Sequence, residues 1–289
     1  MIIAVASGKG GTGKTTVATN LARINGDRNV TFLDCDVEEP DSHLFLKPKI
    51  EKEWPVHTFV PKVDLTLCTF CGKCSELCRF GAIVTLKNNV LVFPELCHGC
   101  EGCKRICPVR AITEGTKEIG IIAEGDSGKI RFLHGRLRIG EAMSPPLIRE
   151  VKRVGLSGNT SALTLIDSPP GTSCPVIEAV KGSDFVLLVT EPTPFGLHDL
   201  KLAVEMVRVL QIPFGVIVNR STTGDREVWR YCEAESIPVL LEIPDDREIA
   251  VAYSRGELIA DALPKYRDHF EMLYEKLKSR SHSSAEVHS

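Results

Sequence analysis

The chain has 289 residues, of which 43% are hydrophobic and 25% charged, with a formal net charge of −3. This composition is that of a folded globular protein, and the weak net charge gives no sign of nucleic-acid or anionic-membrane binding. The longest apolar runs, such as 185–189, are far too short to span a bilayer. The first residues show no basic region and no cleavage signal, so a cytoplasmic location is expected.

A nucleotide-binding pattern opens the chain. Residues 2–6 are typical of a buried strand, and a helix is expected from Thr15 to about Arg23. The intervening Gly8–Thr15 stretch fits G-x-x-x-x-G-K-[ST], in which backbone amides and a helix N-terminus hold phosphates. Lys14 is expected to reach the β- and γ-phosphates and the Thr15 hydroxyl to bind Mg²⁺. The expected nucleotide contacts are Gly8, Gly10, Gly11, Thr12, Gly13, Lys14, Thr15 and Thr16.

Two acids follow the next predicted strand, residues 30–34. Asp34 and Asp36 lie at the carboxyl end of this strand, where parallel sheets bind ligands. The plain alternative is a pair of acids in a solvated loop.

Eight of the eleven cysteines fall between Cys68 and Cys107. They form two C-x₂-C-x₂-C-x₃-C runs, the bacterial ferredoxin pattern, in which the fourth cysteine of each run completes the other cluster. This pattern predicts two [4Fe–4S] clusters: cluster I on Cys68, Cys71, Cys74 and Cys107, and cluster II on Cys97, Cys100, Cys103 and Cys78. Zinc is the alternative, although structural zinc sites use cysteine pairs with a longer gap between them.

The rest of the chain alternates apolar strands with helices. Such alternation predicts a parallel sheet covered by helices on both faces. The expected strands are 119–124, 130–139, 163–167, 185–190, 214–219 and 239–243, and the expected helices are 146–154, 196–210, 225–235 and 264–278. The fold class is therefore an α/β P-loop NTPase with an inserted α+β ferredoxin module. The expected domains are 1–60 with 119–278 for the ATPase and 61–118 for the insert, followed by a disordered tail, 279–289.

The loop contains a second lysine, Lys9, which an ordinary P-loop does not require. Gly8–Thr16 resembles the deviant Walker A of the MinD/ParA/Mrp and nitrogenase iron-protein superfamily. The resemblance implies that Lys9 crosses a dimer interface to the nucleotide of the other subunit. It also implies that Asp36 positions the attacking water and that Asp34 helps to hold the magnesium shell.

Three later segments extend this resemblance. Residues 167–171, D-S-P-P-G, resemble the family's Walker B and switch II, in which Asp167 would act on Mg²⁺ through water and the Gly171 N–H would sense the γ-phosphate. Asn219, at a strand end, matches the residue that reads the adenine edge, although it is equally consistent with a structural role. Pro244 and Asp245 match the loop beneath the base.

Three cysteines lie outside the two runs. Cys174, just past switch II, resembles a cysteine that ligates a shared cluster in the nitrogenase iron protein; the alternative is a simple thiol. Cys35 and Cys232 are most simply interpreted as buried small residues.

The resemblance implies an ATPase that uses ATP/ADP, Mg²⁺ and two [4Fe–4S] clusters, with Lys9, Lys14, Asp36 and Asp167 as its catalytic residues. ATP would drive formation of a homodimer, or of a heterodimer with a paralogue, and thereby gate electron transfer to a redox partner that the sequence does not name. No nucleic-acid partner is expected, and membrane binding is not favoured. One alternative is an Mrp-type iron–sulfur assembly or carrier ATPase. The other is a MinD/ParA-like positional switch with redox-sensing clusters.

Overall fold

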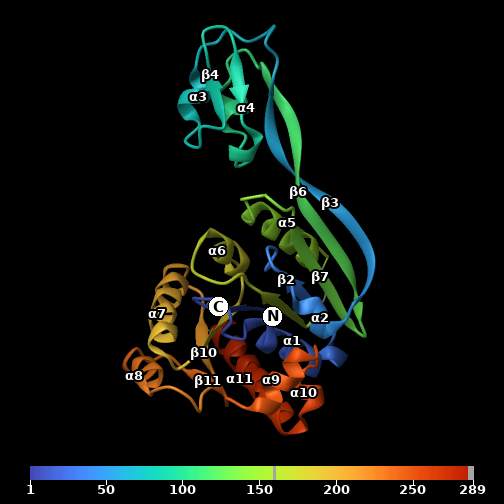
Figure 1. Ribbon diagram of the computed structural model, residues 1–289, viewed down its shortest axis with the longest axis vertical. Coiled ribbons are helices and arrows are strands. Elements are labelled where there is room, and N and C mark those ends of the chain that lie inside the picture. The colour runs from blue at the N-terminus through green and yellow to red at the C-terminus, as the bar shows by residue number, and fades with distance from the viewer. Residues whose placement is uncertain (159–160, 286–289) are drawn as a thin grey trace. The chain divides into compact units, whose positions relative to one another are not determined.

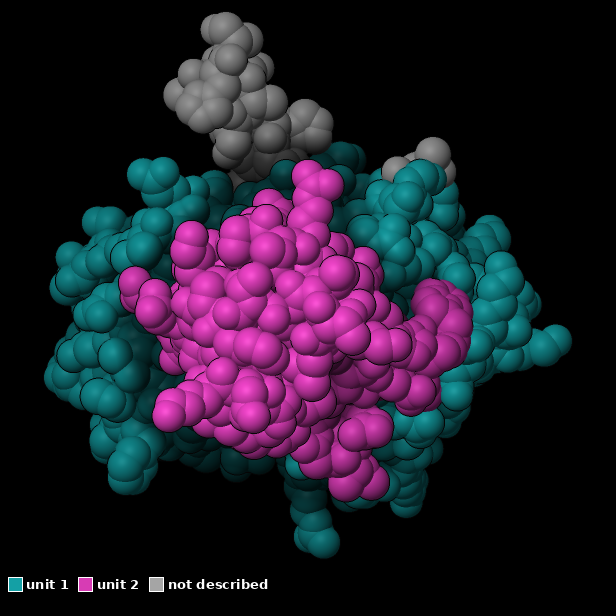
Figure 2. Space-filling model, turned by 90° about the horizontal axis from the view of Figure 1, so that it is seen from above, with its two compact units in different colours: residues 1–53, 122–136, 148–289 teal, residues 54–121, 137–147 magenta. Residues whose placement is uncertain are grey.

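The computed structural model describes residues 1–158 and 161–285, with side chains described to Ser279. The chain divides into two compact units (Figure 2). Unit 1 comprises Met1–Glu53, Ile122–Arg136 and Ile148–Ser289, and unit 2 comprises Trp54–Ile121 and Leu137–Leu147. The predicted insert 61–118 lies within unit 2, which also takes in a returning segment of the chain, Leu137–Leu147.

A mostly parallel sheet forms the centre of unit 1 (Figure 1). Its order through the described residues is β11-β10-β9-β1-β8-β2-β7-β6-β3, and the pairs from β11 to β7 are parallel. The strands are β1 (Ile2–Ala6), β2 (Val30–Asp34), β3 (Lys49–Val63), β6 (Ile112–Ser127), β7 (Ile130–Leu137), β8 (Leu163–Asp167), β9 (Phe185–Thr190), β10 (Phe214–Asn219) and β11 (Val239–Ile243). The predicted α/β class with a mostly parallel sheet is confirmed.

Helices cover both faces of this sheet. One face carries the helices α1 (Lys14–Ile24), α10 (Ile259–Ala262) and α11 (Arg267–Ala285), which contact one another. The other carries α6 (Cys174–Val180), which contacts β1 and β8, and α7 (Pro194–Val209), which contacts β9. The remaining elements are α2 (Ser42–Leu46), α5 (Pro145–Leu156), α8 (Glu227–Ala234), α9 (Arg247–Ser254), η1 (Gly26–Arg28) and η3 (Pro264–Tyr266).

Strand alternation explains the two layers. Ile3 and Val5 of β1 join the core with α1 and α11, while their neighbours face the opposite side, since side chains alternate along a strand. Because these strands are parallel, their carboxyl ends lie along the same side of the sheet, and the candidate site residues follow them. Helix α5 supports α6, because the Lys152 ammonium donates to the carbonyls of Glu178, Ala179 and Lys181 at 2.6–2.8 Å.

Unit 2 has a small core and an internal twofold repeat. Its own elements are α3 (Lys73–Leu77), β4 (Ile83–Thr85), β5 (Val90–Val92), η2 (Pro94–Leu96) and α4 (Gly102–Ile106), together with parts of β3 and β6. Helices α3 and α4 begin five residues after Cys68 and Cys97 respectively. Matching backbone bonds join Phe93 N to Ala82 O and Asp64 N to Ala111 O, both at 2.8 Å.

The backbone conformation repeats as well. Left-handed residues stand two and four positions after the first cysteine of each run, and three positions after the fourth cysteine. They are Phe70 (φ 54°), Gly72 (79°) and Gly81 (64°) in the first half, and Gly99 (68°), Glu101 (57°) and Arg110 (52°) in the second. Non-glycine residues rarely adopt this conformation, so three matched positions show that both cysteine runs fold in the same way.

The last helix extends beyond its predicted end. α11 continues past Lys278 to Ala285, so residues 279–285 of the predicted disordered tail are helical, and 286–289 lie outside the described residues. The sequence after Lys278 contains neither Gly nor Pro, and nothing in it forces the helix to stop. Within the described part of the chain, every helix is too short or too polar to cross a membrane.

Candidate functional site

The strand-to-helix loop before α1 forms one wall of a cavity of about 670 Å³. This volume suits a nucleotide-sized ligand. The predicted residues that line it are Gly10, Gly11, Gly13, Lys14, Thr15, Thr16, Asp36, Asn219, Pro244 and Asp245. Gly11 and Gly13 have φ values of 77° and 94°, a conformation that favours glycine.

Gly8 and Thr12 support the loop from outside the cavity. A Cβ on Gly8 would lie 2.2 Å from the Asp199 carbonyl oxygen, so only glycine lets α7 pack this closely against the loop. Thr12 is buried, and its carbonyl accepts a bond of 2.9 Å from the Asn219 amide. Asn219 therefore holds the loop in this structure, while its Oδ1 accepts from the Arg220 N–H at 3.0 Å.

The carboxylates at the carboxyl ends of β2 and β8 are completely buried. Asp34 and Asp167 are cross-strand partners of β2 and β8, and both are 0% exposed. Burial, reinforced by the charge of Asp167, raises the pKa of Asp34 well above its usual range. Burial also raises the pKa of Asp167 to about 6, although the Lys14 ammonium opposes this shift. Asp167 Oδ1 is buried and has no hydrogen-bond partner among the described residues.

These oxygens fit a hard divalent cation. Mg²⁺ is held by one or two carboxylates together with phosphate oxygens and water, and the cavity offers carboxylates beside the Thr15 hydroxyl. A partner charge of this kind would satisfy the orphan oxygen of Asp167 and relieve the repulsion between the two buried acids.

Asp36 is the predicted acid that lines the cavity itself. Burial raises its pKa to about 7, partly opposed by Lys14. If Asp36 acts as a carboxylate in turnover, kcat/KM for ATP should fall as the pH falls through about 7, because the free enzyme then carries the protonated acid. A pH profile of kcat/KM checks this prediction. Asp36→Asn should leave only a low residual activity, and that residual activity should lack the inflection because an amide does not titrate.

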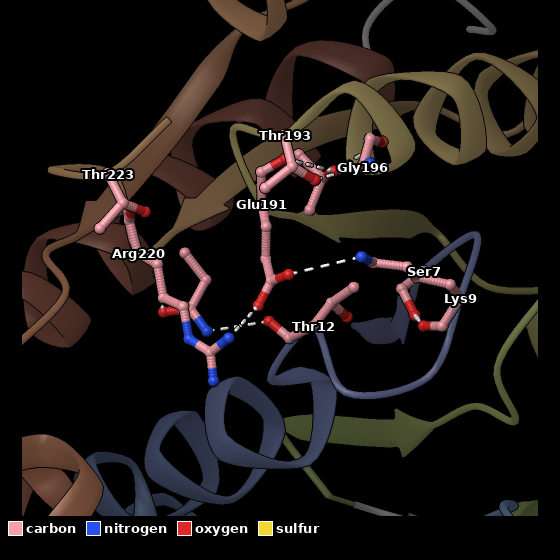
Figure 3. A network of polar contacts seen from close by, with 10 residues as sticks. Ser7, Lys9, Thr12, Glu191, Thr193, Gly196, Arg220 and Thr223 are labelled. Atoms are coloured by element: carbon pink, nitrogen blue, oxygen red, sulfur yellow. Dashed lines mark hydrogen bonds and ion pairs between the residues drawn. The ribbon is translucent and has the colours of Figure 1, made fainter. Parts of the chain in front are cut away.

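Lys9 does not line the cavity in this structure; its side chain takes part in a network of polar contacts around Glu191 (Figure 3). Its ammonium is 3.5 Å from a carboxylate oxygen of Glu191, which also pairs with Arg220 at 2.9 Å. Glu191 is 7% exposed, so both cations compensate a nearly buried charge. The Gly171 N–H likewise has an internal partner, the Ser7 carbonyl at 3.0 Å. Both residues would have to exchange partners to take the roles that the resemblance implies.

The sequence did not point to several wall residues of the cavity. They come from the loops after β2, β10 and β11, from α9 and from α10: Glu39, Asp41, Arg220, Thr223, Asp246, Ile249, Ala250, Tyr253 and Ile259. Asp41 could have been suspected from the acid-rich stretch after Asp36. The α9 residues carry no motif, and only the folded chain shows which way their helix face points.

A second cavity lies in unit 2 among the cysteines. Its lining includes Cys68, Cys71, Cys74 and Cys107, together with apolar residues such as Val63 and Ile112. Cys78 does not line it. Cys97, in turn, has Cys100 and Cys78 as neighbouring thiols, and burial is the main cause that raises its pKa. The described His, Cys, Asp and Glu side chains form no group of three or more around a single metal-ion position.

Backbone amides point at two of the sulfurs. Phe70 N–H donates to Cys68 Sγ at 3.4 Å and Ala111 N–H to Cys107 Sγ at 3.3 Å. Five of the run cysteines also pack against a hydrophobic cluster of unit 2 whose buried members are Ile83, Val90 and Ile112. The leftover cysteines differ: Cys35 and Cys232 are buried as expected, and Cys174 is exposed at the start of α6.

The chain is similar in sequence to several known proteins. A family model described as the CobQ/CobB/MinD/ParA nucleotide-binding domain matches residues 3–259. An uncharacterised protein of Methanocaldococcus jannaschii is 33% identical over 93% of each chain. The iron–sulfur cluster carrier protein of Aquifex aeolicus is 27% identical over 91% of this chain and 62% of its own length. Ferredoxin-3 of a Nostoc species is 27% identical over 21% of this chain and 81% of its own length.

Among solved structures, the septum site-determining protein MinD of Pyrococcus horikoshii, determined with Mg-ADP, superposes with a TM-score of 0.59 at 21% identity. The match covers 96% of this chain and 95% of that one and concerns the fold. The family model spans most of the chain, and the loop, the acids and the parallel sheet agree with it. The chain therefore belongs to the CobQ/CobB/MinD/ParA family of nucleotide-binding domains.

Proposed function

We propose that this protein hydrolyses ATP and uses its nucleotide state to control electron transfer through two [4Fe–4S] clusters to a partner protein. The observation that carries the proposal is the presence, in one chain, of a glycine-rich loop whose Lys14 acts on the buried Asp167 carboxylate and of two cysteine runs that fold alike. The similarity of this chain to Ferredoxin-3, over 21% of this chain, supports the iron–sulfur half of the proposal.

The nucleotide chemistry follows from the residues around the cavity. The loop amides and the Lys14 ammonium would neutralise the β- and γ-phosphates, as in other P-loop sites. Thr15, Asp34 and Asp167 are the residues that would hold Mg²⁺, which supplies charge neutralisation to the phosphates when bound. Asp36 lines the cavity and is free to orient a water for attack on the γ-phosphate.

The cysteine residues of unit 2 fit iron–sulfur clusters. The hydrophobic cluster against which the run cysteines pack has three buried members, Ile83, Val90 and Ile112, and a core this small usually depends on added cross-links or metals. The cavity among Cys68, Cys71, Cys74 and Cys107 and the amides directed at Cys68 and Cys107 are the features of a thiolate cluster site. The clusters would supply one-electron chemistry, and N–H···S bonds of this kind raise their reduction potential.

The Lys9 network suggests how ATP would control assembly. Within one chain Lys9 is held by Glu191, and Arg220 remains as a second counter-charge for that carboxylate. Lys9 can therefore leave for the nucleotide of a second subunit, identical or paralogous, without stranding a buried charge.

Lys9→Ala should accordingly keep ATP binding by the monomer but lose ATP-dependent dimerisation and most hydrolysis. Sedimentation with saturating ATP, in an Asp36→Ala background that traps ATP, measures the dimer. Lys129→Ala is a matched control, because Lys129 is an exposed lysine on a distant turn. A Lys9 variant that dimerises normally with ATP contradicts the proposed switch.

A second candidate function is cluster assembly or delivery. It is favoured by the likeness to the iron–sulfur cluster carrier protein of Aquifex aeolicus. A carrier must release its cluster, whereas five of the run cysteines pack against the core of unit 2 and Cys232 is buried. Transfer of clusters to an apo-acceptor protein would favour the carrier, while stable retention through redox cycles would favour electron transfer.

Anaerobic metal analysis tests the cluster half of the proposal. About eight irons and eight acid-labile sulfides per chain are expected for two cubane clusters. Stoichiometric zinc without sulfide would overturn this half and leave the nucleotide half in place.

A further inference from the structure

Ser42 connects the two buried carboxylates of the nucleotide site. It is the first residue of α2 and is 0% exposed. Its backbone N–H donates to Asp34 Oδ2 and its hydroxyl donates to Asp167 Oδ2, both at 3.1 Å. One small residue therefore bonds both members of the cross-strand acid pair, Asp34 through its backbone and Asp167 through its side chain.

These bonds fix which carboxylate oxygens remain available. Asp34 also accepts from the Asp36 N–H through Oδ1 at 3.1 Å, so both of its oxygens have partners. Asp167 has Oδ2 engaged by Ser42, while Oδ1 is buried without a hydrogen-bond partner. The Ser42 hydroxyl thus restrains rotation of the Asp167 carboxylate and leaves one oxygen for a cation.

Helix α2 carries the effect to the wall of the nucleotide cavity. Three residues after Ser42, Phe45 packs on Tyr253 with ring centroids 4.9 Å apart. Tyr253 belongs to α9 and lines the cavity. The carboxylate pair and one wall residue of the cavity, Tyr253, are therefore connected through one short helix.

We propose that Ser42 is a positioning residue that directs Asp167 Oδ1 toward the divalent cation and couples cation binding to nucleotide binding through α2. The inference rests on the proposed nucleotide site and adds a residue that no phosphate-loop or acid motif contains. Without the hydroxyl, the Asp167 carboxylate loses the hydrogen bond that holds its Oδ2. Removing a hydrogen bond to a charged group changes equilibria by about tenfold or more.

The experiment compares Ser42→Ala with Thr31→Val. Thr31 offers a buried hydroxyl on the same strand as Asp34, three residues away, and its bond to Ser161 at 2.7 Å lies outside the nucleotide cavity. Calorimetry gives the Kd of ADP with and without Mg²⁺, and titration with Mn²⁺ followed by electron paramagnetic resonance gives cation affinity directly. Melting temperatures without ligand report the fold.

Without Mg²⁺, Ser42→Ala should bind ADP with a Kd within about twofold of the wild-type value. The Mg²⁺ enhancement, meaning the factor by which Mg²⁺ lowers the Kd of ADP, should fall about tenfold, and the affinity for Mn²⁺ should fall by a similar factor. Thr31→Val should keep both. The proposal is overturned if Ser42→Ala keeps the enhancement, or if its ADP affinity without Mg²⁺ falls equally, which would mean a structural role. Should Ser42→Ala not fold, Ser42→Cys, a weaker donor of similar size, must show a reduced enhancement. A wild-type protein without any Mg²⁺ enhancement would instead refute the proposed nucleotide site.

Discussion

Lys14→Ala is expected to lower the kcat of ATP hydrolysis by between about 10²- and 10³-fold, the usual cost of removing a main stabiliser of transition-state charge. Lys14 is 7% exposed, and its ammonium is the group that opposes the raised pKa of both Asp36 and Asp167. Its removal therefore takes away the phosphate partner and also leaves the acids without a nearby cation. Steady-state phosphate release measures the effect.

The control for this variant is Lys129→Ala, which removes a lysine that is 71% exposed. Its turnover should equal that of the wild type. A Lys14→Ala protein that retains more than about a tenth of the wild-type kcat would show that the phosphates are neutralised by another residue.

The second large effect concerns Cys78. Cys78→Ala should remove cluster II, although Cys78 stands in the first cysteine run, and Cys107→Ala should remove cluster I. The structure supports this crossed assignment, because the cavity of Cys68, Cys71 and Cys74 takes in Cys107, while Cys78 neighbours Cys97. Each variant should retain about four of eight irons.

Iron and sulfide analysis with electron paramagnetic resonance of the reduced proteins identifies which cluster is lost. Cys232→Ala is the matched control, since this buried cysteine lies in α8, and it should retain both clusters. If Cys78→Ala and Cys74→Ala show the same residual spectrum, each run would hold its own cluster and the crossed assignment would be wrong.

Much of unit 1 was predictable because its strands are short and uniformly apolar. The runs 2–6, 30–34, 163–167 and 185–190 match β1, β2, β8 and β9 residue for residue. Parallel strands buried on both faces carry this signal without alternation, and their carboxyl ends locate the site. Six of the eight predicted loop residues and Asp36 consequently line one cavity, as their positions in the sequence suggested.

The long strand β3 could not be predicted in the same way. Lys49–Val63 contains Pro55 and Pro61 and five consecutive exposed residues from Lys49 to Glu53, a pattern that argues against a strand. Its neighbour in the sheet, β6, lies far away in sequence and supplies the pairing. The return of 137–147 to unit 2 likewise depends on contacts that local sequence does not encode, such as the ion pair of Lys117 with Glu141 at 2.6 Å.

In the candidate site, sequence motifs identified Asp34 and Asp167 but not Ser42, which hydrogen-bonds to both. Asp34 and Asp167 stood out as acids after apolar strands, but Ser42 has no distinguishing neighbours in the sequence. The internal partners of Lys9 and Gly171 could not be anticipated either. Glu191 reaches Lys9 because β9 pairs with β1, and Ser7 reaches Gly171 because β1 pairs with β8. A family resemblance describes the nucleotide-bound dimer, whereas these contacts belong to a single chain.

The most direct test of the central claim is the rate at which the reduced clusters pass electrons to an external acceptor, measured by anaerobic stopped-flow absorbance with ATP, with ADP and without nucleotide. The account predicts a rate with ATP that differs several-fold from the other two, and no such difference in Lys14→Ala, whose clusters are intact. Equal rates under all three conditions in a wild-type protein with full iron content would contradict nucleotide control of electron transfer.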